Sequence, residues 1–299
     1  MRRFDVLRQI ERLDPDRDFV EIYRLMATRE FPWDINQALS FALFRTYAVP
    51  SIGGLLARTG ELTERTQKRY DDTVLILDAV LEHGPDSPQG RSAIRRMNQM
   101  HRSYDISNDD LRYVLATFVV TPIRWIDEFG WRPMSEIERV AGANYYRAVG
   151  RRMGIRDVPE TWQGFSRLLD AYEHEHFGFD AGARSVAEAT LALLATFPPF
   201  HRLPPRLVRP VSLATMDVPL LSAFRFPHPH PVLRALVRGG LKVRGRVVRF
   251  LPPRRQPFFG RMLPQLRSHP DGYDVETLGT FPPGCPVPHA RLPAASATA

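Results

Sequence analysis

The chain has 299 residues, of which 43 % are hydrophobic, enough to bury a sizeable core in one large domain or two smaller ones. Its formal net charge is +8, and a single cysteine excludes an intrachain disulfide framework and any cysteine-based metal or iron–sulfur cluster. The N-terminus lacks the apolar core of a signal peptide, and no apolar run reaches the roughly 18 to 20 residues that a membrane-spanning helix needs. We therefore expect a protein of a reducing, cytoplasmic compartment, without a transmembrane helix.

Helical periodicity recurs along almost the whole chain, with β-like pieces only near residues 272 to 281, and this pattern predicts an all-α protein. We expect a single large domain over residues 1–281, built around a central apolar helix, and a disordered, irregular, proline-rich tail over residues 282–299. The predicted helices cover residues 19–30, 35–49, 63–82, 90–104, 111–126, 136–153, 160–177, 185–197 and 231–250.

Capping residues support two of these helices. Ser107 is placed as the N-cap of the helix 111–126, which is apolar nearly all round and therefore belongs at the centre of the domain. Ser135 and Glu138 have the spacing of a capping box, and Gly154 follows the same helix as a C-terminal stop.

The helix at residues 63–82 carries polar residues beside its apolar face. Arg69 and Thr73 lie on one side of it, with Asp72 about 40° further round. A buried arginine is unfavourable unless it is paired. Either Asp72 neutralises Arg69 within the protein, or both residues face a polar ligand.

The next helix carries a histidine in the middle of its apolar arc. His101 shares this arc with Met97, Met100 and Tyr104. A neutral imidazole on a helix that faces an apolar chamber is how helical proteins hold haem iron, although a single histidine on an apolar face is more often an ordinary core residue. Antiparallel packing of the two helices would place Arg69 and Thr73 across from His101 and form a candidate pocket.

Other sites find less support in the sequence. Glu173 and His176 have the Glu-x-x-His spacing of a di-iron bundle, but no second pair occurs, and His174 does not share a helix face with His176. The chain has no HExxH run, no Gly-x-Ser-x-Gly elbow, no phosphate loop and no Gly-x-Gly-x-x-Gly fingerprint. Metalloproteases, serine hydrolases of that type, P-loop nucleotidases and Rossmann oxidoreductases therefore lose support.

Near the C-terminus, residues 231–250 form a basic amphipathic helix. No acidic residue lies between Asp217 and Asp271, and without the eleven cations of this segment the net charge of +8 would become −3. The helix either packs its apolar half on the core and leaves a solvated basic face, or docks on an anionic membrane surface. The segment has no nucleic-acid-reading motif, so we expect no nucleic-acid partner. The apolar half holds Val232, Leu233, Leu236, Val237, Val243, Val247 and Phe250, and the basic half holds Arg234, Arg238, Lys242, Arg246 and Arg249.

Several segments in order resemble one known family. "KRYDDT", "MNQMHRSYDISNDDLRYVLATFVVTPIRW", "FGWRP", "ERVAGANYYRAVGRRMGI", "DVPETW" and "YEHEHF" are similar to the MpaB-type oxygenase and rubber oxygenase (latex-clearing protein) catalytic domain. The similarity runs from about Phe31 to about Tyr273. It implies an all-α fold with haem b buried among the helices and the use of O2 to cleave carbon–carbon double bonds of isoprenoid chains.

The resemblance also assigns roles to the candidate residues. His101 stands where the family places its proximal haem ligand, and Arg69 and Thr73 match the family's arginine and threonine on the preceding helix. The latex-clearing branch has a lysine immediately before that threonine, whereas this chain has Asp72, and Lys68 is rotated away on the helix. Distal lysine ligation is not carried over, and rubber as the substrate loses support with it.

A function follows from these roles. His101 would hold the haem iron, Arg69 would pair with a propionate or polarise oxygen, and Thr73 or Asp72 would donate or relay a proton, since a carboxyl group in an apolar pocket can stay protonated. The expected protein is a haem b-dependent oxygenase that uses O2 on an apolar, isoprenoid-type substrate and contacts a membrane peripherally through residues 231–250. The alternatives are a non-catalytic helical protein that binds lipid or a membrane surface, and a member of the same fold that has lost haem or uses another metal. The residues expected to line the substrate path are Phe118, Val119 and Trp125.

Overall fold

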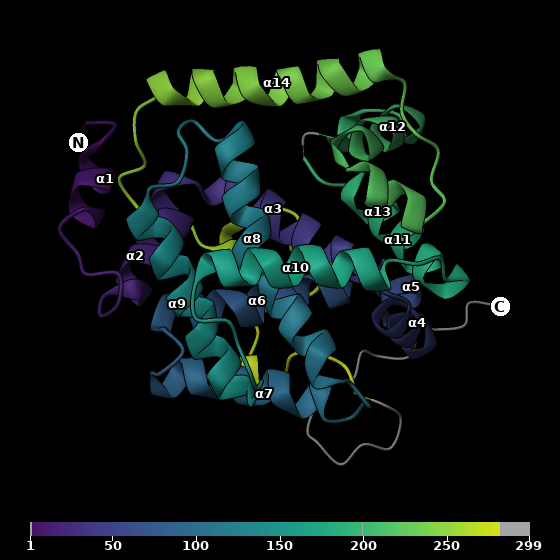
Figure 1. Cartoon of the computed structure of the whole chain (residues 1–299), viewed down its shortest axis with the longest axis horizontal. Helices are drawn as coiled ribbons and strands as arrows, with labels where there is room; N and C mark the ends of the chain where they lie inside the picture. The colour runs from purple at the N-terminus through teal and green to yellow at the C-terminus, as the bar shows by residue number, and fades with distance from the viewer. Residues whose placement is uncertain (1, 199, 282–299) are drawn as a thin grey trace.

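The computed structural model describes residues 2–198 and 200–281, and within these ranges the chain consists of helices and loops without a β-strand (Figure 1). The all-α prediction is confirmed, whereas the predicted β-like stretch is wrong, because residues 275–277 form a short 3-10 helix. The predicted tail, residues 282–299, and Cys285 lie outside the described residues. The helices are α1 (Asp5–Ile10), α2 (Phe19–Leu25), η1 (Met26–Glu30), α3 (Pro32–Thr46), α4 (Pro50–Thr59), α5 (Glu61–Glu64), α6 (Thr66–His83), α7 (Pro88–His101), α8 (Asn108–Phe129), α9 (Glu136–Met153), α10 (Trp162–His176), α11 (Ala181–Leu194), η2 (Phe200–Arg202), α12 (Pro205–Thr215), α13 (Val218–Ala223), α14 (Pro231–Phe250), η3 (Gly260–Met262) and η4 (Val275–Thr277).

Helix α8 is the predicted central helix. It packs against α3, α9 and α10, and most of its residues are buried. The hydroxyl of Ser107 accepts a hydrogen bond from the backbone N–H of Asp110 and caps the helix as expected. A helix that is apolar nearly all round satisfies its backbone internally and can be covered on every side, which fixes α8 in the middle of the domain.

Local signals at the helix ends are largely accurate. The capping box of Ser135 and Glu138 is present in both directions at the start of α9, and Gly154 ends that helix with a φ of 76°. Helix α10 begins slightly later than predicted, because the side chain of Thr161 accepts from the backbone N–H of Gly164 and caps it there. Short helices such as α1, α5 and α13 were not predicted, since they lack the length over which periodicity is visible.

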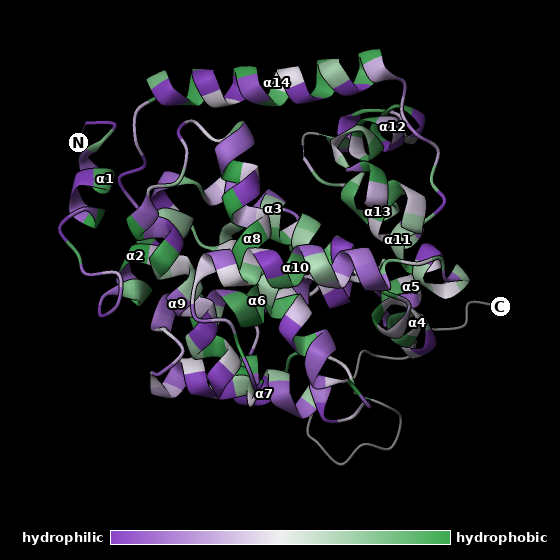
Figure 2. Ribbon diagram, in the orientation of Figure 1, coloured by the Kyte–Doolittle hydropathy of each residue, from purple (hydrophilic) through white to green (hydrophobic). Residues whose placement is uncertain are grey.

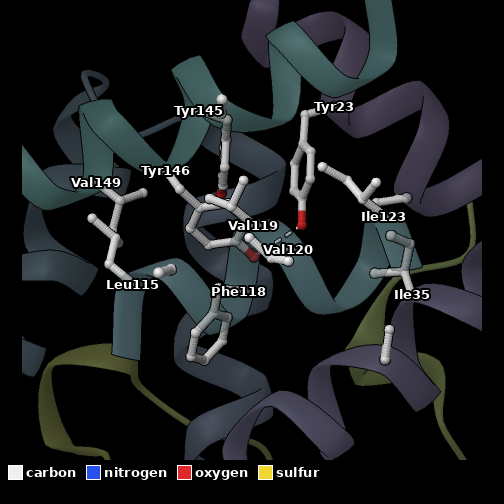
Figure 3. Close-up of a cluster of buried hydrophobic side chains, with 14 of the residues drawn as sticks. Tyr23, Ile35, Leu115, Phe118, Val119, Val120, Ile123, Tyr145, Tyr146 and Val149 are labelled. Atoms are coloured by element: carbon white, nitrogen blue, oxygen red, sulfur yellow. Dashed lines mark hydrogen bonds between the residues drawn. The ribbon is translucent and has the colours of Figure 1, made fainter. Parts of the chain in front are cut away.

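Three buried tyrosines join α2, α8 and α9 in the main core (Figure 3). The hydroxyls of Tyr23 and Tyr146 are hydrogen-bonded at 2.9 Å, and the rings of Tyr23 and Tyr145 stack with their centroids 4.3 Å apart. Phe118 of α8 packs on the ring of Tyr146. Burial raises the pKa of all three phenols, so they stay neutral and act as large core side chains.

The C-terminal segment, residues 259–281, returns across α6 and α7. Carboxylates on α6 hold its backbone: Asp78 accepts from Gly260, Asp71 from Ser268 at 2.9 Å, and Asp72 from Gly279 at 3.0 Å. These contacts join residues about 180 to 210 positions apart. An irregular segment is thereby fixed to a helix whose acidic side would otherwise face solvent.

Helix α14 runs along one edge of the molecule, on the side opposite α7 (Figure 1). Its body-facing side is marked by Gly245, where a Cβ would lie 2.5 Å from the carbonyl oxygen of Phe129. Arg238 pairs with Glu128, and Arg244 pairs with Asp34 at 2.7 Å, on the same side. Figure 2 shows the mixed hydropathy along this helix.

Five residues of the predicted apolar half of α14 point outward, whereas Leu241 and Val248 pack on the main core. The prediction of an apolar half packed on the core is wrong for these five, because the ion pairs and the close glycine contact turn the helix, while Lys242, Arg246 and Arg249 of the predicted basic face are exposed to solvent. The exposed stripe of α14, as we call it, consists of Val232, Leu236, Val243, Val247 and Phe250, with exposures of 59 %, 68 %, 54 %, 53 % and 85 %.

Within the described ranges, no single helix is both long and apolar enough to cross a bilayer. Helices α3 and α4 meet that test only as a pair, and they are bent by 95° relative to each other.

Candidate functional site

His101 is the last residue of α7, and its side chain is largely enclosed. Its Nδ1 atom is buried and has no hydrogen-bond partner among the residues that the structure describes. Burial, together with the nearby charge of Arg69, lowers the pKa of the imidazole to about 4. At neutral pH the ring is therefore uncharged and carries a nitrogen that the described protein does not satisfy.

Arg69 and Thr73 form a connected pair on α6. The guanidinium of Arg69 donates to the hydroxyl of Thr73, and that hydroxyl donates to the backbone carbonyl of Arg69 at 2.7 Å. The two bonds hold the arginine side chain along the helix, one turn from its origin. Since the charge of Arg69 acts on His101, the packing of α6 on α7 brings Arg69 and His101 together, as the antiparallel arrangement predicted.

Tyr47, which no pattern in the sequence indicated, is also close enough for its phenol to feel the charge of Arg69. The residue follows α3 and is 6 % exposed. Burial raises the pKa of its phenol, and the charge of Arg69 partly offsets this rise. Arg69 is thus a cation that acts on both His101 and Tyr47. Tyr47 and Arg69 lie on different helical segments, so periodicity within one helix does not link them.

Asp72 faces a different set of groups. It is fully buried and pairs with Lys68, while its other oxygen contacts Nε2 of His269 at 2.8 Å. Arg69 donates to Thr73 and not to Asp72, so the internal Asp72–Arg69 pair is not the arrangement that the structure has. The expected apolar pocket around Asp72 is also absent, since an ammonium, an imidazole and a backbone N–H contact the carboxylate.

These contacts have a consequence for the predicted roles. Lys68 was expected to be rotated away on the helix from the position of the family's lysine, which Asp72 occupies here, yet its ammonium pairs directly with Asp72 and serves as the counter-ion of that carboxylate. A carboxylate with three polar partners is held in place by them, which favours a structural role in fixing the C-terminal segment. The proton-relay role of Asp72 stays a prediction.

Gly279 brings the C-terminal segment next to the residue before His101. Its φ is +89°, and a Cβ at this position would lie 2.1 Å from Sδ of Met100. Only glycine suits both the backbone conformation and the space. The segment therefore covers α7 at the end that carries His101, a contact that sequence periodicity did not indicate.

The other candidates lie in the core. Phe118, Val119 and Trp125 are buried in the main cluster of apolar side chains, and the indole of Trp125 donates to Asp34 at 3.3 Å. Glu173 forms an ion pair with Arg45.

This ion pair gives the Glu-x-x-His spacing a structural explanation. Tyr113 also donates to Glu173, at 3.1 Å, which leaves the carboxylate well occupied. Within residues 2–198 and 200–281, no three His, Cys, Asp or Glu side chains gather where they could share a metal ion. A single histidine with an open nitrogen is instead the donor set of an axially held haem, and His101 fits that description.

The chain is also similar in sequence to known proteins. A family model described as the catalytic domain of the ER-bound oxygenase mpaB/B' and rubber oxygenase matches residues 37–250. The chain is 30 % identical over 262 residues to the ER-bound oxygenase mpaB' of Penicillium brevicompactum, covering 80 % of this chain and 60 % of that protein. It is 34 % identical over 206 residues to the ER-bound oxygenase mpaB of Penicillium roqueforti, covering 62 % of this chain and 69 % of that protein.

A third relative, the ER-bound oxygenase mpaB of Penicillium brevicompactum, is 36 % identical over 158 residues. That match covers 50 % of this chain and 40 % of the relative. The chain thus spans between about two fifths and about two thirds of the length of these relatives.

Proposed function

Because the chain belongs to the family of MpaB-type oxygenases and rubber oxygenases, we propose that it is a haem b-dependent oxygenase that uses O2 on an apolar substrate. The observation that carries the proposal is His101. Its imidazole is neutral at pH 7, and its buried Nδ1 lacks a partner within the described chain. Leaving a buried polar atom unsatisfied costs about 1 to 3 kcal/mol, so a site that keeps one is expected to use the ring for something.

The donor set suits haem better than a bare metal ion. A non-haem ion needs several protein ligands, and the described residues offer no cluster of three around any point. In a haem the porphyrin fills four positions, and one neutral imidazole is sufficient as the protein's ligand. When bound, the group would supply the iron that activates O2.

The residues of this chain would contribute binding and charge. His101 would hold the iron through its neutral ring, and the lowered pKa keeps that ring free of a competing proton over the physiological range. Arg69 would supply a fixed positive charge beside it, suited to a propionate carboxylate. Thr73 positions the guanidinium through its hydroxyl and can exchange a proton with a bound polar group.

The substrate class follows from the surroundings and from the family. The core around α8 is lined by aliphatic and aromatic side chains, which suit an apolar molecule. Among apolar substrates we propose isoprenoid chains, the class that the family resemblance implies. Since Asp72 is engaged by Lys68, the chain offers no free lysine on that turn of α6 of the kind found in the latex-clearing branch.

The proposed function includes contact with a membrane through residues 231–250. The relatives are called ER-bound, and a water-insoluble substrate is reached most directly from a lipid surface. Helix α14 supports the contact because its exposed stripe is unpartnered in the described structure.

The proposal is tested by an absorption spectrum of protein produced with haem supplied. We expect a Soret band that is lost in His101→Ala and kept in His174→Ala, a matched change at an exposed histidine of α10. A colourless, well-folded wild-type protein would overturn the haem assignment. An unchanged Soret band in His101→Ala would remove His101 as the ligand.

The alternative of a non-catalytic lipid-binding protein is addressed by the same experiment. A lipid-binding protein does not need a neutral His101 near an Arg69 that is held in place by Thr73, whereas α14 suits either function. Consumption of O2 with an isoprenoid substrate, dependent on Arg69 and His101, would favour the oxygenase. Vesicle binding without haem or oxygen reactivity would favour the alternative.

A further inference from the structure

The exposed stripe of α14 runs along nearly the whole helix. Its first and last members, Val232 and Phe250, are 18 residues apart, which corresponds to about 27 Å along a helix axis. Gly239 and Gly240 lie on the same side in the middle and add no polar group, and a Cβ at either would meet nothing within 4 Å. The result is a long, narrow, straight apolar surface without a cover in the described structure.

We infer that this stripe inserts into the headgroup region of an anionic membrane and that a groove formed by the last turns of α14 and the loop after it binds the phosphate of an anionic lipid. The inference deepens the membrane contact of the proposed function and names its partner. It depends on the orientation of α14, which the sequence left open.

The orientation is fixed by contacts on the other side of the helix. Gly245 lies against the backbone at the end of α8, and Arg238 and Arg244 pair with Glu128 and Asp34. A helix on a soluble surface turns its apolar residues inward and its charges outward. Here Arg238 and Arg244 face the body beside Leu241 and Val248, while the stripe is turned outward. An exposed apolar stripe is unfavourable in water and favourable at a lipid surface.

The charge beside the stripe has a single sign. Arg246 and Arg249 are exposed along one flank, together with Lys242, whose ammonium also lies 3.6 Å from Glu128, and all three are within reach of a surface that the stripe contacts. The acidic groups that approach α14, Glu128 and Asp34, already have arginine partners. A positive flank beside an inserted apolar strip matches a negatively charged bilayer and repels a basic surface.

The groove adds a specific site for a phosphate. It has a volume of about 500 Å³ and is bordered by the last turns of α14, the loop after it and the segment around η1. Arg3 lies over the ring of Trp131, and its Nε and Nη2 atoms are buried without a hydrogen-bond partner in the described residues. Its residues are Arg3, Arg29, Glu30, Pro32, Trp33, Asp34, Arg244, Val248, Leu251, Pro252, Pro253 and Arg254.

The balance of charge in the groove is positive. Four arginines and two carboxylates line the groove, which leaves an excess of two positive charges. Asp34 is paired with Arg244, and Glu30 shares Arg132 with Glu138. Guanidinium groups bind phosphate oxygens with directed hydrogen bonds. Leu251 and the two prolines that follow it place apolar surface next to these cations, as a lipid with both a phosphate and acyl chains requires.

A bilayer fits these features better than a second protein. A protein partner for a strip one residue wide would have to supply a matching groove and acidic residues along one flank only. A planar anionic surface meets both requirements at once, and its acyl region accepts Phe250, the most exposed residue of the stripe.

The test is flotation of the haem-loaded protein with two kinds of vesicle. One kind is phosphatidylcholine alone, and the other also contains about 30 mol % phosphatidylglycerol. We expect binding to the anionic vesicles that weakens as salt is raised. Val247→Ser/Phe250→Ser is expected to weaken it more than tenfold, whereas the matched change Leu207→Ser/Val218→Ser, at exposed apolar residues off the stripe, should leave it within twofold.

Two further variants separate charge from insertion. Arg246→Gln/Arg249→Gln should weaken binding to anionic vesicles about tenfold. Fluorescence of the Phe250→Trp variant should be quenched by brominated acyl chains.

The outcomes distinguish the inference from the function on which it rests. Equal binding of the wild type and the stripe variant, absence of quenching, or a vesicle-independent dimer that the stripe variant abolishes would each overturn the membrane inference. A normal Soret band in those variants would leave the haem proposal intact. Colourless protein that still floats with anionic vesicles would overturn the haem proposal and leave the docking surface standing.

Discussion

The positive charge of Arg69, one helix away, acts on the imidazole of His101 and adds to burial in lowering the pKa of that ring to about 4. The relationship makes the two residues one electrostatic unit, because a protonated His101 would be both desolvated and close to a cation. It also keeps the imidazole of His101 uncharged at physiological pH.

The stability of the haem-free protein is expected to depend on His101 below neutral pH. The unfolded chain takes up a proton on this residue near pH 6.5, whereas the folded protein resists protonation down to about pH 4. Stability is therefore lost as the pH falls from about 6.5 to about 4, by at most about 3 kcal/mol. Urea denaturation of the wild type and of His101→Gln over this range measures it.

The informative quantity in that experiment is the difference between the two proteins. Carboxylates also titrate near pH 4, but they are common to both, so their contribution cancels. The wild type should lose its advantage relative to His101→Gln as the pH falls. Parallel curves for the two proteins would show that His101 titrates normally in the folded state.

Removal of the charge at Arg69 should raise the pKa of His101. We expect Arg69→Gln to shift the histidine titration upward, by up to about one pH unit, because only the desolvation of the ring is then left to oppose protonation. The measurement is NMR of the imidazole Cε1–H in haem-free protein. Arg65→Gln, at a more exposed arginine of the same region that pairs with Glu61, is the control and should leave the titration unchanged.

The buried pair of Lys68 and Asp72 should matter for stability more than for the site. Lys68→Met leaves a buried carboxylate without its ammonium and is expected to lower the free energy of unfolding by about 3 to 5 kcal/mol. Lys68→Met/Asp72→Asn should recover part of this loss, since the unpaired charge is then gone. Denaturant unfolding gives both values.

The same variants examine the catalytic role predicted for Asp72. If Asp72 fixes the C-terminal segment, the folded fraction of Asp72→Asn should keep its haem content and its reactivity with O2. A loss of oxygen reactivity in Asp72→Asn with normal stability and a normal Soret band would instead support proton transfer by this residue.

Two glycines of α14 should respond to alanine in opposite directions. Gly245→Ala places a Cβ 2.5 Å from a backbone carbonyl oxygen, so the helix must move off the end of α8, and we expect a loss of about 1 to 3 kcal/mol. Gly240→Ala meets nothing within 4 Å and should gain about 0.5 to 1 kcal/mol from helix propensity. Thermal unfolding of both variants checks the orientation of α14, and equal effects would contradict it.

Features that depend on neighbours along the chain can be predicted from the sequence alone. The caps at Ser107 and Ser135, the stop at Gly154 and the central position of α8 follow from hydrogen bonds and periodicity within a few residues, and the structure has all of them. The apolar arc that contains His101 is also local, since it needs only the geometry of one helix. Spacing and the antiparallel packing of two consecutive helices were sufficient to bring Arg69 towards it.

Contacts between segments that are distant in the sequence depend on the tertiary packing and could not be predicted from local patterns. Asp72 is close to Arg69 in the sequence, yet its partners are Lys68 and His269, and His269 is 197 positions away. These partners meet because the C-terminal segment, which carries His269, crosses α6. An amphipathic helix has two faces, and the sequence pattern does not show which of them packs against the rest of the protein. The orientation of α14 depends on one glycine that permits a close backbone contact and on two ion pairs with Glu128 and Asp34, so the exposed stripe lies outside while Leu241 and Val248 pack inward.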